Sequence, residues 1–130
     1  MMEGVDGLRI FKTKEFARFA RREGISDAML REAVERAGRG LVDADLGGGL
    51  IKQRVARPGQ GRRGGFRTLM AFSFAQQTVF LYGFAKSERD NIGPDELEFW
   101  RRVARGFLGM DDAQWQTMLA ARDIMEVDDG

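Results

Sequence analysis

The sequence contains no cysteine and no histidine. Without cysteine there is no disulfide framework and no thiolate nucleophile. Without histidine the chain lacks the commonest general base and the commonest metal ligand of proteins. No apolar run approaches the roughly 18 residues that a membrane-spanning helix needs, and the N-terminus has no apolar signal segment. We therefore expect a cytoplasmic protein without membrane contact, and we expect neither a metal nor another cofactor.

Acidic residues are almost missing from the middle of the chain. The whole sequence is nearly neutral, with 21 basic and 20 acidic side chains. Residues 1–45 carry nine of each, whereas residues 46–89 carry eight basic side chains and one acidic side chain, and residues 90–130 carry four basic and ten acidic. Charge blocks inform about partners rather than about fold. We interpret residues 46–89 as a surface for a polyanion, with RNA as the favoured one.

The N-terminal third has the pattern of a strand followed by two amphipathic helices. Residues 7–11 alternate as a strand does. Thr13 is placed to cap the first helix, which Gly24 ends, and Ser26 is placed to cap the second. Apolar residues recur at helical spacing at Phe16, Phe19, Ala20, Leu30, Ala33, Val34 and Ala37. The arginines of these helices alternate with glutamates, which we interpret as a solvated, salt-bridged face.

Residues 50–56 predict a strand with two different faces, because successive side chains of a strand point to opposite sides. One face is apolar apart from Gln53. Lys52 and Arg54 lie on the other face, close enough together to hold one phosphodiester. These two cations are the first candidates for a functional site.

Two further strands follow and complete an antiparallel meander over residues 50–85. Residues 66–74 place Arg67 on the face opposite to their phenylalanines, and residues 78–85 are almost wholly apolar, as central strands are.

Residues 57–65 contain one proline, four glycines and three arginines, and this composition predicts a loop. Glycine lets the backbone approach a ligand closely, and guanidinium groups hydrogen-bond phosphate. The candidate RNA-binding residues are therefore Arg57, Arg62 and Arg63, together with Gln53 on the neighbouring strand.

The last third is predicted to be mainly helical. Pro94 suits the first turn of a helix with an apolar stripe, and Asp111 and Gln114 have the spacing of a capping box for a last helix. Residues 124–127 suit a short closing strand, and residues 128–130 suit a frayed tail.

These elements predict a single α+β domain over residues 1–130. Its parts are a small antiparallel or mixed sheet, two N-terminal helices packed on the sheet, and a helical C-terminal tail. A chain of 130 residues is long enough to bury one real core.

The central sequence resembles that of a known family. The runs concerned are Gly-Gly-Gly-Leu-Ile-Lys-Gln-Arg-Val-Ala-Arg-Pro-Gly-Gln-Gly, then Gly-Gly-Phe-Arg-Thr, then Tyr-Gly-Phe-Ala-Lys-Ser-Glu-Arg-Asp-Asn-Ile. They resemble toxins of bacterial type II toxin–antitoxin systems, in the RelE-like branch of the RelE/ParE superfamily that includes some HigB-type toxins. The resemblance covers nearly the whole chain and implies the same order of strand, two helices, three strands and helical tail.

The resemblance also implies an activity, its partners and its site residues. It implies a ribosome-dependent endoribonuclease that cuts mRNA in the decoding site, and a cognate antitoxin, usually a small DNA-binding protein encoded nearby. Lys52 and Arg54 match the family's pair of strand cations, and Arg67 matches the arginine after a Gly-aromatic pair. Lys86 and Arg89 fall in the family's basic segment after the last sheet strand.

Two positions depart from the family pattern. Ser87 aligns with an arginine that is important in RelE toxins, and Gly93 lies near the place of a downstream tyrosine. The histidines of other HigB toxins have no counterpart in this chain. Lys86 or Arg89 is our candidate to replace the missing cation.

Cleavage of this kind attacks a phosphodiester with its own 2′-hydroxyl. It needs a base for that hydroxyl, charge stabilisation at the phosphorane and an acid for the leaving oxygen. Like charge disfavours the protonated form of a lysine, so Lys52 among arginines is our candidate base. The chemistry needs no metal, and no carboxylate cluster in the sequence indicates one. The candidate catalytic residues are Lys52, Arg54, Arg67, Lys86 and Arg89.

Two other functions stay open. A ParE-like poison of DNA gyrase would have the same superfamily fold, so the fold does not decide between them. A non-catalytic relative that only binds nucleic acid or antitoxin would fit the changes at Ser87 and Gly93. Retention of Lys52, Arg54 and Arg67 favours the ribonuclease.

Overall fold

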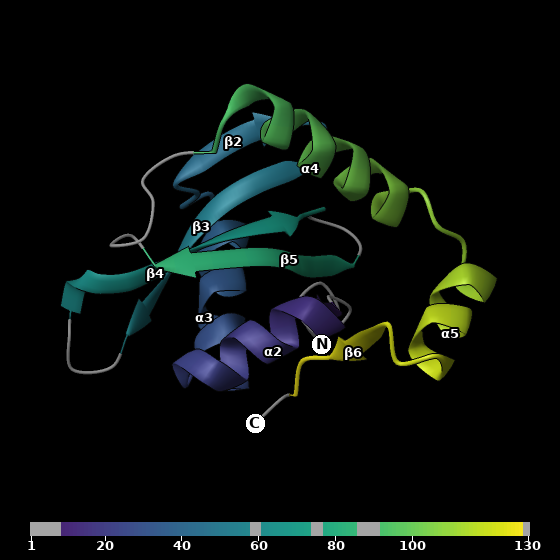
Figure 1. The fold of residues 1–130 in the computed structure, drawn as a ribbon, viewed down its shortest axis with the longest axis horizontal. Coiled ribbons are helices and arrows are strands. Elements are labelled where there is room, and N and C mark those ends of the chain that lie inside the picture. Colours follow the sequence, from purple (N-terminus) through teal and green to yellow (C-terminus); the bar gives the residue numbers. More distant parts are fainter. Residues whose placement is uncertain (1–8, 58–60, 74–76, 86–91, 129–130) are drawn as a thin grey trace.

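The computed structural model describes residues 9–57, 61–73, 77–85 and 92–128, and these form an α+β fold around one six-stranded sheet (Figure 1). The strands are β1 (Ile10–Thr13), β2 (Ala44–Gly47), β3 (Leu50–Arg57), β4 (Gly61–Ala71), β5 (Thr78–Ala85) and β6 (Ile124–Glu126). The helices are α2 (Lys14–Glu23), α3 (Asp27–Gly38), α4 (Pro94–Leu108) and α5 (Asp112–Ala120). The sheet order is β2-β3-β4-β5-β1-β6, in which β1 runs parallel to β5 and every other pair is antiparallel. The predicted α+β class, the mixed sheet and the meander are confirmed.

The first two helices begin where their caps predict. The Thr13 hydroxyl oxygen accepts a hydrogen bond of 3.1 Å from the Phe16 N–H, and the Ser26 hydroxyl oxygen accepts one of 3.2 Å from the Met29 N–H. Gly24 ends α2 with a φ of 73°, in the left-handed region that glycine adopts without strain.

The alternation along the strands sorts the core into two sides of the sheet. The core on the side of α2 and α3 includes Ile51, Val55, Phe66 and Met70. The core on the side of α4 and α5 includes Leu50, Leu69 and Ala71. We call these the α2/α3 side and the α4 side of the sheet (Figure 1). The two faces predicted for residues 50–56 are therefore observed, with Lys52 and Arg54 on the α4 side.

One hairpin was not predicted from the sequence. Strand β2 pairs with β3, and Gly47, Gly48 and Gly49 connect them with φ values of 90°, 66° and 85°. Helix α4 packs directly on this turn: a Cβ added to Gly49 would overlap the Cδ1 atom of Leu108, and Nε of Arg101 donates a hydrogen bond of 2.6 Å to the Leu46 carbonyl oxygen. The three glycines thus serve both the left-handed turn and the close approach of α4.

The loop predicted over residues 57–65 is wrong at Arg57 and from Gly61 onward, and residues 58–60 lie outside the described part of the structure. Strand β4 begins at Gly61, and Arg57 pairs with Gly61 across the hairpin, so Arg62 and Arg63 lie on a strand. Pairing with β3 overrides the local preference of glycine for turns, as tertiary context often does for strands. The side chains of these three arginines lie outside the described part of the structure.

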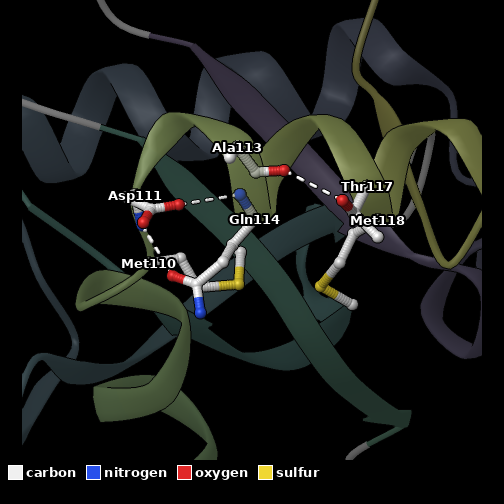
Figure 2. Close-up of a pocket in the computed structure, with 6 residues that line it drawn as sticks. All are labelled: Met110, Asp111, Ala113, Gln114, Thr117 and Met118. Atoms are coloured by element: carbon white, nitrogen blue, oxygen red, sulfur yellow. Dashed lines mark hydrogen bonds between the residues drawn. The ribbon is translucent and has the colours of Figure 1, made fainter.

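The C-terminal elements follow the sequence signals. Pro94 occupies the first turn of α4, and α5 has the predicted capping box (Figure 2). The Gln114 N–H donates to Oδ1 of Asp111, and the Asp111 N–H donates to Oε1 of Gln114, both at 2.8 Å. Strand β6 closes the sheet beside β1. No helix in the described ranges is long and apolar enough to cross a membrane.

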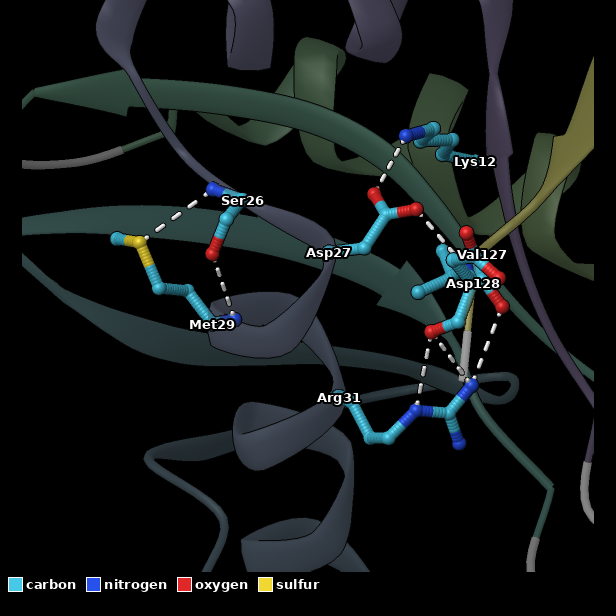
Figure 3. Close-up of polar contacts among 7 residues, drawn as sticks. All are labelled: Lys12, Ser26, Asp27, Met29, Arg31, Val127 and Asp128. Atoms are coloured by element: carbon cyan, nitrogen blue, oxygen red, sulfur yellow. Dashed lines mark hydrogen bonds and ion pairs between the residues drawn. The ribbon is translucent and has the colours of Figure 1, made fainter. Parts of the chain in front are cut away.

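The chain is held in place at Asp128 rather than frayed there (Figure 3). The Asp128 N–H donates a hydrogen bond of 2.8 Å to Oδ2 of Asp27, and Arg31 donates to the Asp128 carbonyl oxygen. Lys12 donates to the other oxygen of Asp27 at 2.6 Å. The Asp27 carboxylate therefore joins β1, α3 and the tail, and the predicted fraying is wrong at this residue.

These contacts change the acidity of Asp27. Partial burial works to raise the pKa of its carboxyl, but the hydrogen bonds from Lys12 and from the Asp128 backbone, with the nearby positive charges, outweigh it. The pKa of Asp27 is consequently lowered from its ordinary value of 3.8.

Candidate nucleic-acid interface

The register between β3 and β4 brings Lys52, Arg54 and Arg67 to the same side of the sheet. Arg54 pairs directly with Arg67, and Lys52 lies two residues before Arg54 on the same face. Directly paired residues have Cβ atoms about 4.5–5.5 Å apart, and residues two apart on a strand are separated by about 6.6–6.8 Å. All three side chains are half-buried. We call these three residues the strand cations.

The strand cations have no acidic partner among the residues that the structure describes. The described ion pairs lie elsewhere, such as Arg36–Glu32 within α3 and Lys12–Asp27 between β1 and α3. Like charges directly opposite each other in a sheet are destabilising, so the Arg54–Arg67 pair does not stabilise the fold. A cluster of this kind suits the binding of an anion such as phosphate.

Two neighbours position Arg54. From α3, Nη2 of Arg36 donates a hydrogen bond to the Arg54 carbonyl oxygen. From β4, Gly65 leaves room for the stem of the arginine, because a Cβ there would lie 3.2 Å from Cγ of Arg54. The Nε atom of Arg54 is buried and has no hydrogen-bond partner in the described ranges, which leaves a donor that an anion would satisfy.

Sequence reasoning missed both of these neighbours. Arg36 was assigned to a salt-bridged helix face, and it does pair with Glu32 at 2.9 Å, but no sequence signal indicates its second contact. Gly65 lay within the predicted loop, although its place just before the aromatic residue and Arg67 was a usable signal.

Gln53 does not belong to this surface. Its side chain is fully buried on the α2/α3 side. Nε2 donates to the carbonyl oxygens of Ala33 and Leu41, each at 3.0 Å, and Oε1 accepts a hydrogen bond of 3.1 Å from the Asp43 N–H. The prediction that Gln53 contacts RNA is corrected, because its amide is already bonded to the backbone at and after α3.

Aromatic rings lie beside the strand cations on β5 and α4. Arg67 pairs with Phe84, and Tyr82 on the same strand stacks against Trp100 with ring centroids 5.3 Å apart. The Nε1 atom of Trp100 is buried without a hydrogen-bond partner in the part of the chain that is described. These rings give the cationic surface an apolar border of the kind against which nucleobases stack.

The remaining candidates are placed less completely. Lys86, Arg89 and Ser87 lie outside the described residues. Gly93 is the N-cap residue of α4, and because glycine has no side chain, this helix has no side-chain cap.

A different hollow, of about 410 Å³, lies beside α5 (Figure 2). It is lined by Met110, Asp111, Ala113, Gln114, Thr117 and Met118. Its only charged residue is acidic, so it does not fit a polyanion.

Comparison with known families gives a match that covers nearly all of the chain. A family model described as the RelE toxin of the RelE / RelB toxin-antitoxin system matches residues 8–127. A comparison with curated proteins finds no match. The family match does not separate a HigB-type branch, so that subtype stays a prediction.

Proposed function

The chain belongs to the RelE toxin family of toxin–antitoxin systems, and from this premise we propose that it is a metal-independent endoribonuclease that cuts mRNA on the ribosome. The family implies a cognate antitoxin as partner. The ribosome and mRNA as targets, and the cytoplasm as location, are parts of the proposal. The observation that supports it best is the direct pairing of Arg54 with Arg67 beside Lys52, without an acidic partner in the described ranges.

In the proposed reaction the 2′-hydroxyl of one nucleotide attacks the adjacent phosphorus. The bond from phosphorus to the 5′-oxygen breaks, and a 2′,3′-cyclic phosphate forms. Negative charge grows on the phosphoryl oxygens, where Arg54 and Arg67 would stabilise it. Lys52 would take the hydroxyl proton, and the departing 5′-oxygen would take a proton from water to leave as a hydroxyl. Lys86 or Arg89 would supply the further cation that Ser87 lacks.

Dependence on the ribosome suits a site without histidine. A lysine is a weaker choice of base near neutral pH, so more of the rate must come from orientation of the RNA. A ribosome that holds mRNA in the decoding site would provide this orientation and would restrict cleavage to bound message.

The test is a cleavage assay on ribosomes that hold a defined mRNA, with the cut mapped by primer extension and naked mRNA alongside. We expect the wild type to cut in the decoding site only. Arg67→Ala should lose this activity, whereas Arg102→Ala, which changes an exposed arginine on α4, should keep it. Absence of cleavage by folded wild-type protein would exclude the ribonuclease and leave gyrase poisoning or antitoxin binding alone.

The role of Lys52 has its own test. Lys52→Ala should lower the single-turnover cleavage rate and should flatten its dependence on pH, because the base is gone. If Lys52→Ala cuts as fast as the wild type, the base is another group.

A further inference from the structure

Strand β5 extends beyond the strand that pairs with it on one side. β1 pairs with β5 only at Thr78, Val79 and Phe80, because the chain turns into α2 at Thr13. On its other side β5 stays paired with β4 as far as Ala85. In the described ranges, no strand continues β1 along the second half of β5.

A β-bulge determines which backbone groups face this edge. The Thr78 N–H donates to the Arg9 carbonyl oxygen, which fixes the side of β5 that faces β1. The pairing with β4 then skips Leu81. This extra residue shifts by one position the alternation of backbone groups between the two edges of β5. Beyond the bulge, the N–H and C=O groups of Gly83 and Ala85 point to the open side, where no described residue bonds them. Such groups are a template for another strand.

Helix α2 packs against β5 (Figure 1). A cavity of about 290 Å³, lined by residues of both elements, lies next to the open edge. Its walls include Leu81 and Gly83 from the strand, and Phe19, Arg18 and Arg22 from the helix. The open edge of β5 therefore borders a hollow that is partly lined by apolar side chains, rather than a flat surface.

The helix wall of the cavity is positively charged. Arg18 and Arg22 are exposed, and Arg18 forms no ion pair within the described ranges. Arg22 contacts Glu23 only at 3.5 Å, and Glu15 is the one acidic residue that lines the cavity. Residues four apart on a helix are about 6 Å apart along its axis, and alternate residues of a strand are separated by about 6.6–6.8 Å. Carboxylates at alternate positions of an extended peptide would therefore match these two arginines.

We propose that an extended, acidic segment of the cognate antitoxin adds to the sheet as a strand beside Gly83 and Ala85, with its carboxylates against Arg18 and Arg22. The unpaired backbone N–H and C=O groups of Gly83 and Ala85 favour a polypeptide as the partner, because RNA has no such groups at the spacing of a β-strand. The proposal rests on membership of the toxin family and not on the ribonuclease activity. The occupied edge is separated from Lys52 and Arg54 by β4.

The test uses residue-resolved amide hydrogen exchange on the free toxin and on its complex with the antitoxin encoded beside it. We expect the amides of Gly83 and Ala85 to exchange rapidly in the free protein and at least tenfold more slowly in the complex. The Thr68 amide, on a strand paired at both edges, should change little. The double variant Arg18→Glu/Arg22→Glu should weaken antitoxin binding at least tenfold, whereas Arg102→Glu should leave it within twofold.

Three results would overturn the proposal. The first is a stoichiometric complex in which the Gly83 and Ala85 amides exchange as in the free protein, whatever the effect of the arginine variants. The second is unchanged antitoxin affinity in the double variant. The third is protection of these two amides by an RNA oligonucleotide but not by the antitoxin. Because Arg18 and Arg22 lie outside the proposed catalytic surface, the double variant should still cut mRNA on ribosomes. The cleavage assay thus tests the ribonuclease proposal, and the exchange and affinity measurements test the antitoxin proposal independently of it.

Discussion

Replacement of Gln53 by leucine tests whether this residue is a structural link or an RNA contact. The side chain sits between Lys52 and Arg54 in the sequence but faces the opposite side of the sheet, where its amide makes three hydrogen bonds. Leucine has a similar size and cannot make any of them. The substitution therefore removes the link with little change in packing volume.

The expected cost follows from the surroundings of the three bonds. The bond to Ala33 is fully buried, but the Ala33 carbonyl oxygen lies within α3 and keeps its place in the helical hydrogen-bond pattern, so about 0.5–1.5 kcal/mol is expected for its loss. The other two bonds reach the exposed residues Leu41 and Asp43, where water replaces the amide, and about 0.5–1.5 kcal/mol each is expected. Burial of an apolar side chain offsets part of this. We expect a net loss of about 1–3 kcal/mol, a substantial part of the roughly 5–15 kcal/mol that stabilises an ordinary domain.

Urea unfolding followed by tryptophan fluorescence measures this loss. Gln116→Leu is the matched control, because Gln116 is exposed on α5, and its effect should stay within about 0.5 kcal/mol. RNA affinity measured on the folded Gln53→Leu protein completes the test. A variant as stable as the control, with weakened RNA binding, would refute the structural interpretation and restore Gln53 to the RNA surface.

Three further predictions concern charge, pH and backbone space. Arg67→Ala should leave the free energy of unfolding unchanged or raise it by about 0.2–1 kcal/mol, since it relieves a like-charge pair. Ribosome-dependent cleavage should fall by about 10²–10³-fold. A lower free energy of unfolding in urea would contradict this prediction. Asp27→Asn should flatten the dependence of stability on pH in acid. The lowered pKa of Asp27 stabilises the fold above the ordinary value of 3.8, and this contribution is lost as the pH falls below that value. The urea midpoints at pH 7 and pH 3 should therefore differ less in the variant than in the wild type. Gly83→Ala should destabilise by about 1–3 kcal/mol, because a Cβ there would overlap the Phe19 ring. Its control, Gly106→Ala, has open space and a helical backbone, so a gain of about 0.5–1 kcal/mol in thermal or urea unfolding is expected.

Local signals predicted the parts of the fold that local physics decides. The caps at Thr13, Ser26 and Asp111 depend on a side chain that reaches a backbone N–H three residues later, and all three are observed. Alternation likewise placed Lys52 and Arg54 on one face, because the side-chain period of a strand is fixed by its backbone.

Features that depend on distant partners could not be read in the same way. Strand β2 and the first residues of β4 contain glycines and charges that favour turns, and only pairing with β3 makes them strands. The direct pairing of Arg54 with Arg67 depends on a register that shifts between Val55 and Arg57, and no local pattern shows such a shift. The environment of Gln53 depends in turn on where the chain runs after α3.

The position of β1 in the sheet has a consequence for synthesis of the protein. This strand is made first, but its two neighbours are β5 and β6, and Lys12 pairs with Met125 near the opposite end of the chain. Contacts between residues so far apart in sequence form late, because a long loop must close before they are made. A nascent chain can assemble the meander of β3, β4 and β5 from neighbouring segments, but β1 gains its second partner only after the last strand has emerged. If the protein attacks translating ribosomes as proposed, the ribosome that makes it has already translated the segment of β6 before the toxin domain is fully folded.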